Sequence, residues 1–128
     1  MIHDEICTYE VCKLAKEKGF NEYVEAFYAE NCDTAHSQGP EKWNEYKDRY
    51  AAPTQSLLQR WLREEKGIVI EVVCMPTTRT NSKYEYKRHL FWGSNGRYFE
   101  SEYGDEIFDT YELALEDALK YALDSLVI

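Results

Sequence analysis

Long apolar runs, a secretory leader and metal-binding spacings are all missing from this sequence. No hydrophobic run approaches the about 20 residues that a membrane-spanning helix needs, so we expect no membrane span. The N-terminal MIHDEICTYE lacks the basic and apolar parts of a signal peptide, which predicts a cytoplasmic protein. The four cysteines form no CxxC pair and the three histidines show no ligand spacing, so we expect neither a zinc site nor a cofactor.

Motifs that carry catalysis are missing as well. A nucleophile needs a base and an orienting group, and no motif such as GxSxG brings the cysteines and histidines of this chain together. The GSNG of residues 93–96 has two glycines, which is typical of a hairpin turn rather than of a phosphate-binding loop. The sequence therefore predicts a protein that is not an enzyme.

Basic residues are scarce overall but gather in the middle of the chain. The formal net charge is −9, which argues against non-specific binding of nucleic acid, because that binding depends on neutralising phosphates. Residues 97–128 hold nine acidic and two basic residues, whereas residues 54–97 hold eight basic and four acidic ones. The basic middle leaves room for a local anion-binding face.

The clearest local pattern runs from Ala51 to Met75. Thr54 can cap a helix, and Gly67 can adopt the left-handed conformation that ends one. An apolar stripe is expected from Leu57, Leu58, Trp61 and Leu62, and a polar side from Gln55, Gln59, Arg60, Arg63 and Lys66. The β-branched residues that follow, IVIEVV at 68–73, predict a largely buried strand.

Two further helices are expected, at 8–18 and at 109–128. Thr8 can cap the first, and Gly19 can end it. Asp109 and Glu112 fit a capping box for the second. Its inner face is expected to hold Tyr111, Ala114, Leu115, Ala118, Leu119, Ala122, Leu123 and Leu126, whereas the carboxylates of Glu112, Glu116 and Asp117 are expected on a solvated face.

The remaining patterns indicate strands and one long loop. Residues 83–92 alternate between apolar and polar, residues 97–103 form the returning strand, and Asn95-Gly96 between them favours a hairpin. The aromatic segment 20–28 favours a strand, with a helix as the alternative. Residues 30–50 show no clear periodicity and predict a long irregular loop. A helical turn near 41–49 could anchor that loop to the core through Trp43 and Tyr46.

These elements predict one α+β domain over residues 1–128. The connections between the three strands after residue 67 are short enough for an antiparallel meander. We expect a two-layer sandwich, with a three- to four-stranded, mainly antiparallel sheet and about three helices packed on one face. A chain of 128 residues buries enough surface for a core without disulfides.

Three segments resemble a group of small uncharacterised proteins encoded by bacterial prophages and other mobile elements, typically of gut bacteria. The segments are APTQSLLQRWLREEKGI, CKLAKEKGF and TYELALEDALKYAL, and together they cover about a third of the chain. The resemblance implies a cytoplasmic protein associated with a phage or mobile element. It implies no activity, substrate or catalytic residue.

Two surfaces are candidates for binding. A basic face would combine Arg60, Arg63, Lys66, Lys87 and Arg88, since arginine pairs well with phosphate; the alternative is that these residues pair with Glu64, Glu65 and Glu85. An aromatic face would combine Tyr84, Tyr86, Trp92, Tyr98 and Tyr103, and the alternative is that the helices bury it.

The function that these features favour is a non-catalytic protein-interaction or accessory module. Eleven tyrosines exceed what a small core needs, and tyrosine is enriched at interfaces. A protein partner or a second copy of the chain would be bound. The alternative is an accessory factor that binds nucleic acid through the basic face, or that mimics nucleic acid with its acidic C-terminal third.

Overall fold

The computed structural model confirms the predicted α+β class. The structure describes residues 4–76, 82–92, 97–103 and 107–126, with side chains for 4–72 and 107–124. The helices in this part are α1 (Tyr9–Glu17), α2 (Gln55–Lys66) and α3 (Tyr111–Tyr121), and the short turns are η1 (Trp43–Glu45) and η2 (Ala122–Leu126). The strands are β1 (Val24–Ala29), β2 (His36–Glu41), β3 (Arg49–Ala51), β4 (Ile68–Pro76), β5 (Ser82–Trp92) and β6 (Arg97–Tyr103).

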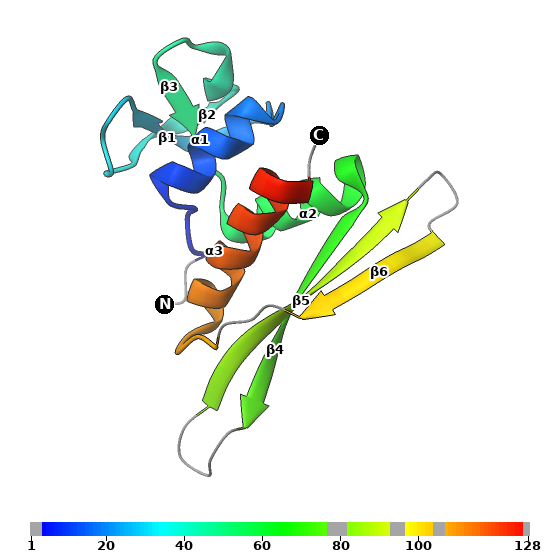
Figure 1. Cartoon of the computed structure of the whole chain (residues 1–128). Coiled ribbons are helices and arrows are strands. Elements are labelled where there is room, and N and C mark those ends of the chain that lie inside the picture. Colours follow the sequence, from blue (N-terminus) through cyan, green and yellow to red (C-terminus); the bar gives the residue numbers. More distant parts are fainter. Residues whose placement is uncertain (1–3, 77–81, 93–96, 104–106, 127–128) are drawn as a thin grey trace.

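The helices lie between two antiparallel sheets (Figure 1). The long sheet has the order β4-β5-β6 and is the predicted meander, and α2 and α3 pack against it. The small sheet has the order β2-β1-β3 and contacts α1 through β3. The sequence did not predict this second sheet. The turn predicted at 93–96 lies outside the described residues.

Residues 30–50 are not the irregular loop that the sequence predicts. They contain β2, η1 and most of β3, and both strands pair with β1. Of the segment 20–28, residues from Val24 on form a strand, as predicted, whereas residues 20–23 lie before it. The sequence of β2, HSQGPE, has no β-branched or apolar side chain except proline, so local propensity gives no strand signal. The segment is a strand because its backbone pairs with the aromatic strand β1, and not because its own residues favour one.

Local chemistry sets the ends of α2 where the sequence predicts them. The Thr54 hydroxyl accepts a hydrogen bond from the Leu57 amide at 3.2 Å, and Gly67 ends the helix with φ of 68°. Leu58, Trp61 and Leu62 are buried, as expected. The prediction that Gln55 lies on the polar side is wrong, because this residue is only 4% exposed.

Helix α1 begins with a cap and a pair of buried cysteines. Thr8 is the N-cap, and its hydroxyl accepts from the Val11 amide at 3.4 Å. Cys7, which precedes the cap, and Cys12, the fourth helical residue, are both fully buried. Apolar residues at these two positions pack together and fix the direction from which the chain enters a helix, and thiols serve here as small apolar groups.

Helix α3 begins one residue later than the capping box predicts. Thr110 rather than Asp109 caps it, since the Thr110 hydroxyl accepts from the Leu113 amide at 3.1 Å. Tyr111 lies outside the inner face and is 42% exposed. The other predicted inner positions with described side chains are buried: Ala114, Leu115, Ala118, Leu119, Ala122 and Leu123.

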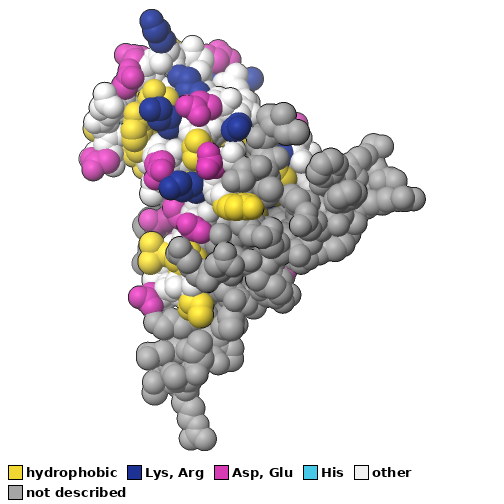
Figure 2. Space-filling model, viewed as in Figure 1, with side chains coloured by type: hydrophobic (Ala, Val, Ile, Leu, Met, Phe, Trp, Pro, Cys, Tyr) yellow, Lys and Arg dark blue, Asp and Glu magenta, His cyan; other side chains and the backbone are white. Residues whose placement is uncertain are grey.

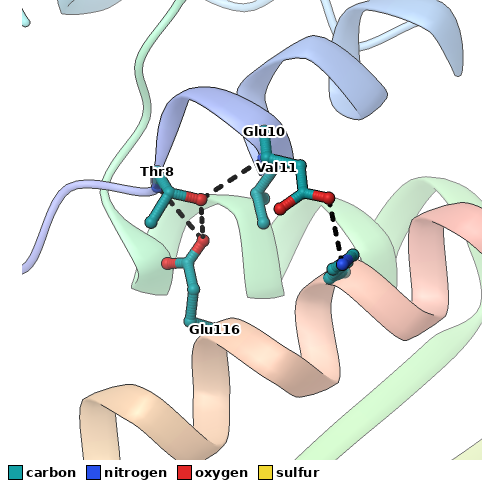
Figure 3. Close-up of polar contacts among 5 residues, drawn as sticks. Thr8, Glu10, Val11 and Glu116 are labelled. Carbon is teal, nitrogen blue, oxygen red and sulfur yellow. Dashed lines mark hydrogen bonds and ion pairs between the residues drawn. The ribbon is translucent and has the colours of Figure 1, made fainter. Parts of the chain in front are cut away.

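Glu116 joins the three helices, which contradicts its predicted place on a solvated face. One carboxylate oxygen accepts from the Thr8 amide at 3.1 Å and from the Thr8 hydroxyl at 2.9 Å (Figure 3). The other oxygen accepts from Gln55 Nε2 at 2.9 Å, and that nitrogen also donates to the Glu112 carbonyl. A carboxylate at the start of α1 also interacts favourably with the helix dipole. The buried Gln55 amide therefore has acceptors, and α3 is fixed against the first turns of α1 and α2.

Two leucines of α3 test the position of the core. Leu119 is fully buried and Leu113 is 55% exposed. Leu119→Ala should lower the free energy of unfolding by about 2–5 kcal/mol, because it leaves a cavity between helices and sheet. Leu113→Ala should change it by less than about 0.5 kcal/mol. Urea unfolding followed by circular dichroism measures both, and equal losses would contradict the assigned orientation of α3.

The Glu116 junction predicts energetic coupling between α2 and α3. In a double-mutant cycle, Gln55→Ala and Glu116→Ala should couple by about 0.5–3 kcal/mol, because each removes a partner of the other. The control is Glu10 and Lys120, an ion pair of 3.0 Å between exposed side chains, which should couple much more weakly because solvent screens it. A coupling for Gln55 and Glu116 no larger than the control value would contradict a joining role for Glu116.

Candidate functional site

Three aromatic side chains form a continuous wall at the small sheet. The ring centroids of Phe27 and Trp43 lie 4.6 Å apart, and those of Trp43 and Tyr46 lie 5.8 Å apart. Phe27 lies on β1, Trp43 lies in η1, and Tyr46 follows η1 directly. Trp43 is buried, as its predicted anchoring role requires, whereas Tyr46 is 41% exposed. The wall therefore begins in the core and ends at the surface.

The Arg49 guanidinium lies against this wall. Its central carbon is 4.7 Å from the Phe27 ring centroid, 5.3 Å from that of Trp43 and 5.0 Å from that of Tyr46. Arginine stacks well on aromatic faces because its cation is planar and weakly hydrated. Within the described residues, the guanidinium has no hydrogen-bond acceptor and no ion-pair partner, although Arg49 is partly buried. Its N–H donors are available to a ligand.

Lys16 of α1 fixes the backbone that carries Arg49. Its ammonium donates to the carbonyls of Tyr46 at 2.7 Å and Arg49 at 2.8 Å, and more weakly to that of Lys47 at 3.4 Å. The same ammonium lies 4.8 Å from the centroid of the Tyr50 ring. An ammonium has three donors and takes up carbonyls that a tight loop would otherwise leave unpaired. The Lys16 ammonium therefore fixes the backbone of residues 46–49.

Two side chains anchor the preceding turn. The Trp43 indole donates to the Val24 carbonyl at 2.9 Å. The Asn44 amide donates to the Phe20 carbonyl at 2.6 Å, and its oxygen accepts from the Ala51 amide at 2.7 Å. The connection from β2 to β3 is consequently held at both ends, and the site is largely ordered before any ligand binds.

The outer strands of the small sheet are poorly suited to pairing with another strand. On β3, the Arg49 carbonyl already bonds Lys16 and the Ala51 amide already bonds Asn44. On β2, Pro40 has no N–H to donate, and Gly39 has a left-handed φ of 94°. Binding at this sheet is therefore expected to use side chains on its surface rather than an added strand.

The segment that carries Arg49 is acidic overall, although the Lys16 ammonium of α1 lies beside it. Residues 20–51 hold seven acidic and three basic residues, a net charge of 3 − 7 = −4. Figure 2 shows Asp and Glu interspersed with Lys and Arg over the upper part of the visible face, where the small sheet and α1 lie. Tyr46 donates its hydroxyl hydrogen to Glu41, and this bond raises the pKa of the Tyr46 phenol above its ordinary value.

The predicted basic face is only partly described. Arg60 pairs with Glu64 at 3.1 Å, as the alternative interpretation expected, and Lys66 lies over the Trp61 ring at 5.3 Å. Arg63 is exposed. The side chains of Lys87 and Arg88 lie outside the described part, and their backbone positions in β5 are opposite Glu71 and Ile70 of β4.

The predicted aromatic face falls on β5 and β6, where the structure describes the backbone but not the side chains. The register places Tyr84 opposite Cys74 and Tyr86 opposite Val72. Tyr103 is opposite Lys87, Tyr98 is opposite Phe91, and Trp92 is opposite Arg97. An aromatic interaction face on this sheet stays a prediction.

Neither Arg49 nor Lys16 nor Phe27 was among the residues predicted for a site. A signal was present, because Trp43, Tyr46 and Arg49 follow one another at intervals of three residues. That spacing predicts a shared face only if the segment is a helical turn. The contribution of Phe27, which lies 22 residues before Arg49, depends on sheet pairing that the sequence does not reveal.

The buried Cys7 thiol is a poor nucleophile in this fold. The pKa of the Cys7 thiol lies well above its usual value, mainly because of the hydrogen bond with Cys12 and secondly because of burial, whereas a reactive cysteine needs a lowered pKa.

Within the described residues, no three histidine, cysteine or acidic side chains are grouped to hold a metal ion, and no helix is long and apolar enough to cross a membrane. No family model matches the chain, and searches of curated proteins and of solved structures find no significant match.

The contacts of Lys16 predict its effect on the site. Lys16→Met keeps the length of the side chain but removes the ammonium, so the carbonyls of residues 46–49 lose their donor. The free energy of unfolding should fall by about 1–3 kcal/mol, and amide exchange at residues 46–51 should accelerate. Hydrogen exchange measured by NMR reports both effects.

Lys13→Met is the matched control for this substitution. Lys13 is exposed on the same helix, and its replacement should change stability by less than about 0.5 kcal/mol. Unchanged exchange in Lys16→Met, or the same acceleration in both variants, would contradict the role assigned to the Lys16 ammonium.

Proposed function

We propose that the protein is a non-catalytic binding module that contacts a partner protein through its small sheet, with Arg49 at the centre of the contact. The observation that carries this proposal is the partly buried guanidinium, stacked on Phe27, Trp43 and Tyr46 and without an acceptor in the described chain. Arginine and aromatic residues are the types most enriched in the energetic centres of interfaces. The fixed backbone around Arg49 supports the same role, since little order has to be gained on binding.

Charge favours a protein over nucleic acid as the partner of this surface. A net charge of −4 over residues 20–51 repels a polyanion, whereas a partner with few negative groups is tolerated. Nucleic-acid binding is the second candidate and would use a different surface. It is favoured by the exposed Arg63 and Lys66 on α2, in a segment that is basic overall.

A phage or mobile-element origin and a cytoplasmic location are parts of the proposal that the sequence resemblance supports. The partner would then be a protein of the host cell or of the element, or a second copy of this chain. Each of these is compatible with a side-chain contact at the small sheet.

Affinity capture with matched arginine variants tests the proposal. The tagged wild type, Arg49→Gln and Arg63→Gln would be incubated with an extract of the source cells, and bound proteins quantified by mass spectrometry. A specific partner should be retained by the wild type and by Arg63→Gln, and reduced about 30-fold or more by Arg49→Gln, as for a central interface residue.

Circular dichroism and urea unfolding must first show that Arg49→Gln is folded. A partner retained equally by all three proteins would contradict the role of Arg49. Nucleic acid that is bound by the wild type and by Arg49→Gln but lost with Arg63→Gln would favour the second candidate.

A further inference from the structure

We infer that Arg49 recognises a single carboxylate group, from an acidic side chain or a chain terminus of the partner. This inference rests on the proposed function and names the chemistry of its central contact. The shared feature of both sources is a planar anion with two oxygens and one negative charge. The guanidinium matches such a group with two parallel N–H donors.

The geometry of the aromatic wall leaves the guanidinium donors open. The three rings adjoin one another at 4.6 and 5.8 Å, so they form one wall, and Arg49 lies against it. Aromatic rings hold the position of the cation but provide no strong hydrogen-bond acceptor for its N–H groups. The donors at the edge of the group are therefore positioned and unpaired within the described residues, which suits a ligand that supplies two acceptors.

Arg60 and Arg63 show what distinguishes Arg49 from the other arginines with described side chains. Arg60 donates through Nε to Glu64 at 3.1 Å, so its donors are partly engaged. Arg63 is exposed and, within the part of the chain that the structure describes, forms no ion pair and no ring contact. A freely moving side chain loses more conformational entropy on binding than one already held against three rings. Arg49 combines unpaired donors with a fixed position, which neither of the others does.

Charge selects a carboxylate over phosphate at this position. Glu41, Glu45 and Asp48 lie within eight residues of Arg49 in the sequence, but so do Lys42 and Lys47, and the Lys16 ammonium donates to the Arg49 carbonyl. These three cations balance the three carboxylates, which leaves the charge of the guanidinium uncompensated. It neutralises a carboxylate, whereas a phosphate monoester with nearly two negative charges at pH 7.5 keeps about one of them unpaired.

Titration of the protein with small anions tests the inference without knowledge of the partner. Acetate and inorganic phosphate would be added separately at pH 7.5 and constant ionic strength, with sodium chloride as the reference. The reporter is the NMR resonance of the Trp43 indole N–H, which is bonded to Val24 and lies beside the guanidinium. Acetate should shift it in a saturable manner, and phosphate at equal concentration should shift it less.

Two variants assign the shift to the arginine fork. Arg49→Lys keeps the charge but loses the two parallel donors, so the acetate-dependent shift should fall at least severalfold. Arg63→Lys should leave it unchanged. The Trp43 resonance also shows that each variant is folded, because it depends on the hydrogen bond to Val24.

The outcomes separate this inference from the proposed function. A phosphate shift equal to or larger than the acetate shift would overturn the assignment to a carboxylate. No saturable shift with either anion, or an unchanged shift in Arg49→Lys, would overturn Arg49 as an anion-binding residue. Partner capture that depends on Arg49 would still support the proposed function in those cases, and an acetate site without such capture would contradict only the proposed function.

Discussion

The organisation of the small sheet depends on the ammonium of Lys16. It lies on α1, and the carbonyls of Tyr46, Lys47 and Arg49 converge on it. Without a cation at this point, those carbonyls would need water or another donor while the chain turns sharply from η1 into β3. The position of Arg49 follows from that turn, and the aromatic wall follows from the pairing of β1 with β3. One interaction between a helix and a loop thus links the helical layer to the candidate site.

The helical layer is itself held by polar contacts at its centre. Glu116 accepts hydrogen bonds from Thr8 and Gln55, so α3 is joined to the starts of both α1 and α2 (Figure 3). Binding sites are more precise when they rest on elements whose own positions are fixed by packing and hydrogen bonds. The small sheet meets this condition, since α1 carries Lys16 at one end and bonds Glu116 at the other.

Sequence reasoning succeeded where structure is determined locally. The cap at Thr54 and the ending at Gly67 depend on residues within one helical turn, and the meander of β4, β5 and β6 follows from alternation and short connections. It failed where partners are distant in the chain. Glu116 bonds Gln55 and Thr8, which precede it in the sequence by 61 and 108 positions. The HSQGPE segment becomes a strand only beside β1. For the same reason the sequence pointed to Arg60 and Arg63 and overlooked Arg49.

The way in which the small sheet ends has a consequence for the behaviour of the protein at high concentration. Exposed strand borders are the usual templates on which identical chains stack into fibrils or exchange segments. Here Lys16 and Asn44 occupy backbone groups of one border, and Pro40 interrupts the other. This end of the molecule can present the Arg49 guanidinium and its aromatic wall to other proteins without offering a free strand edge on which fibrils could grow.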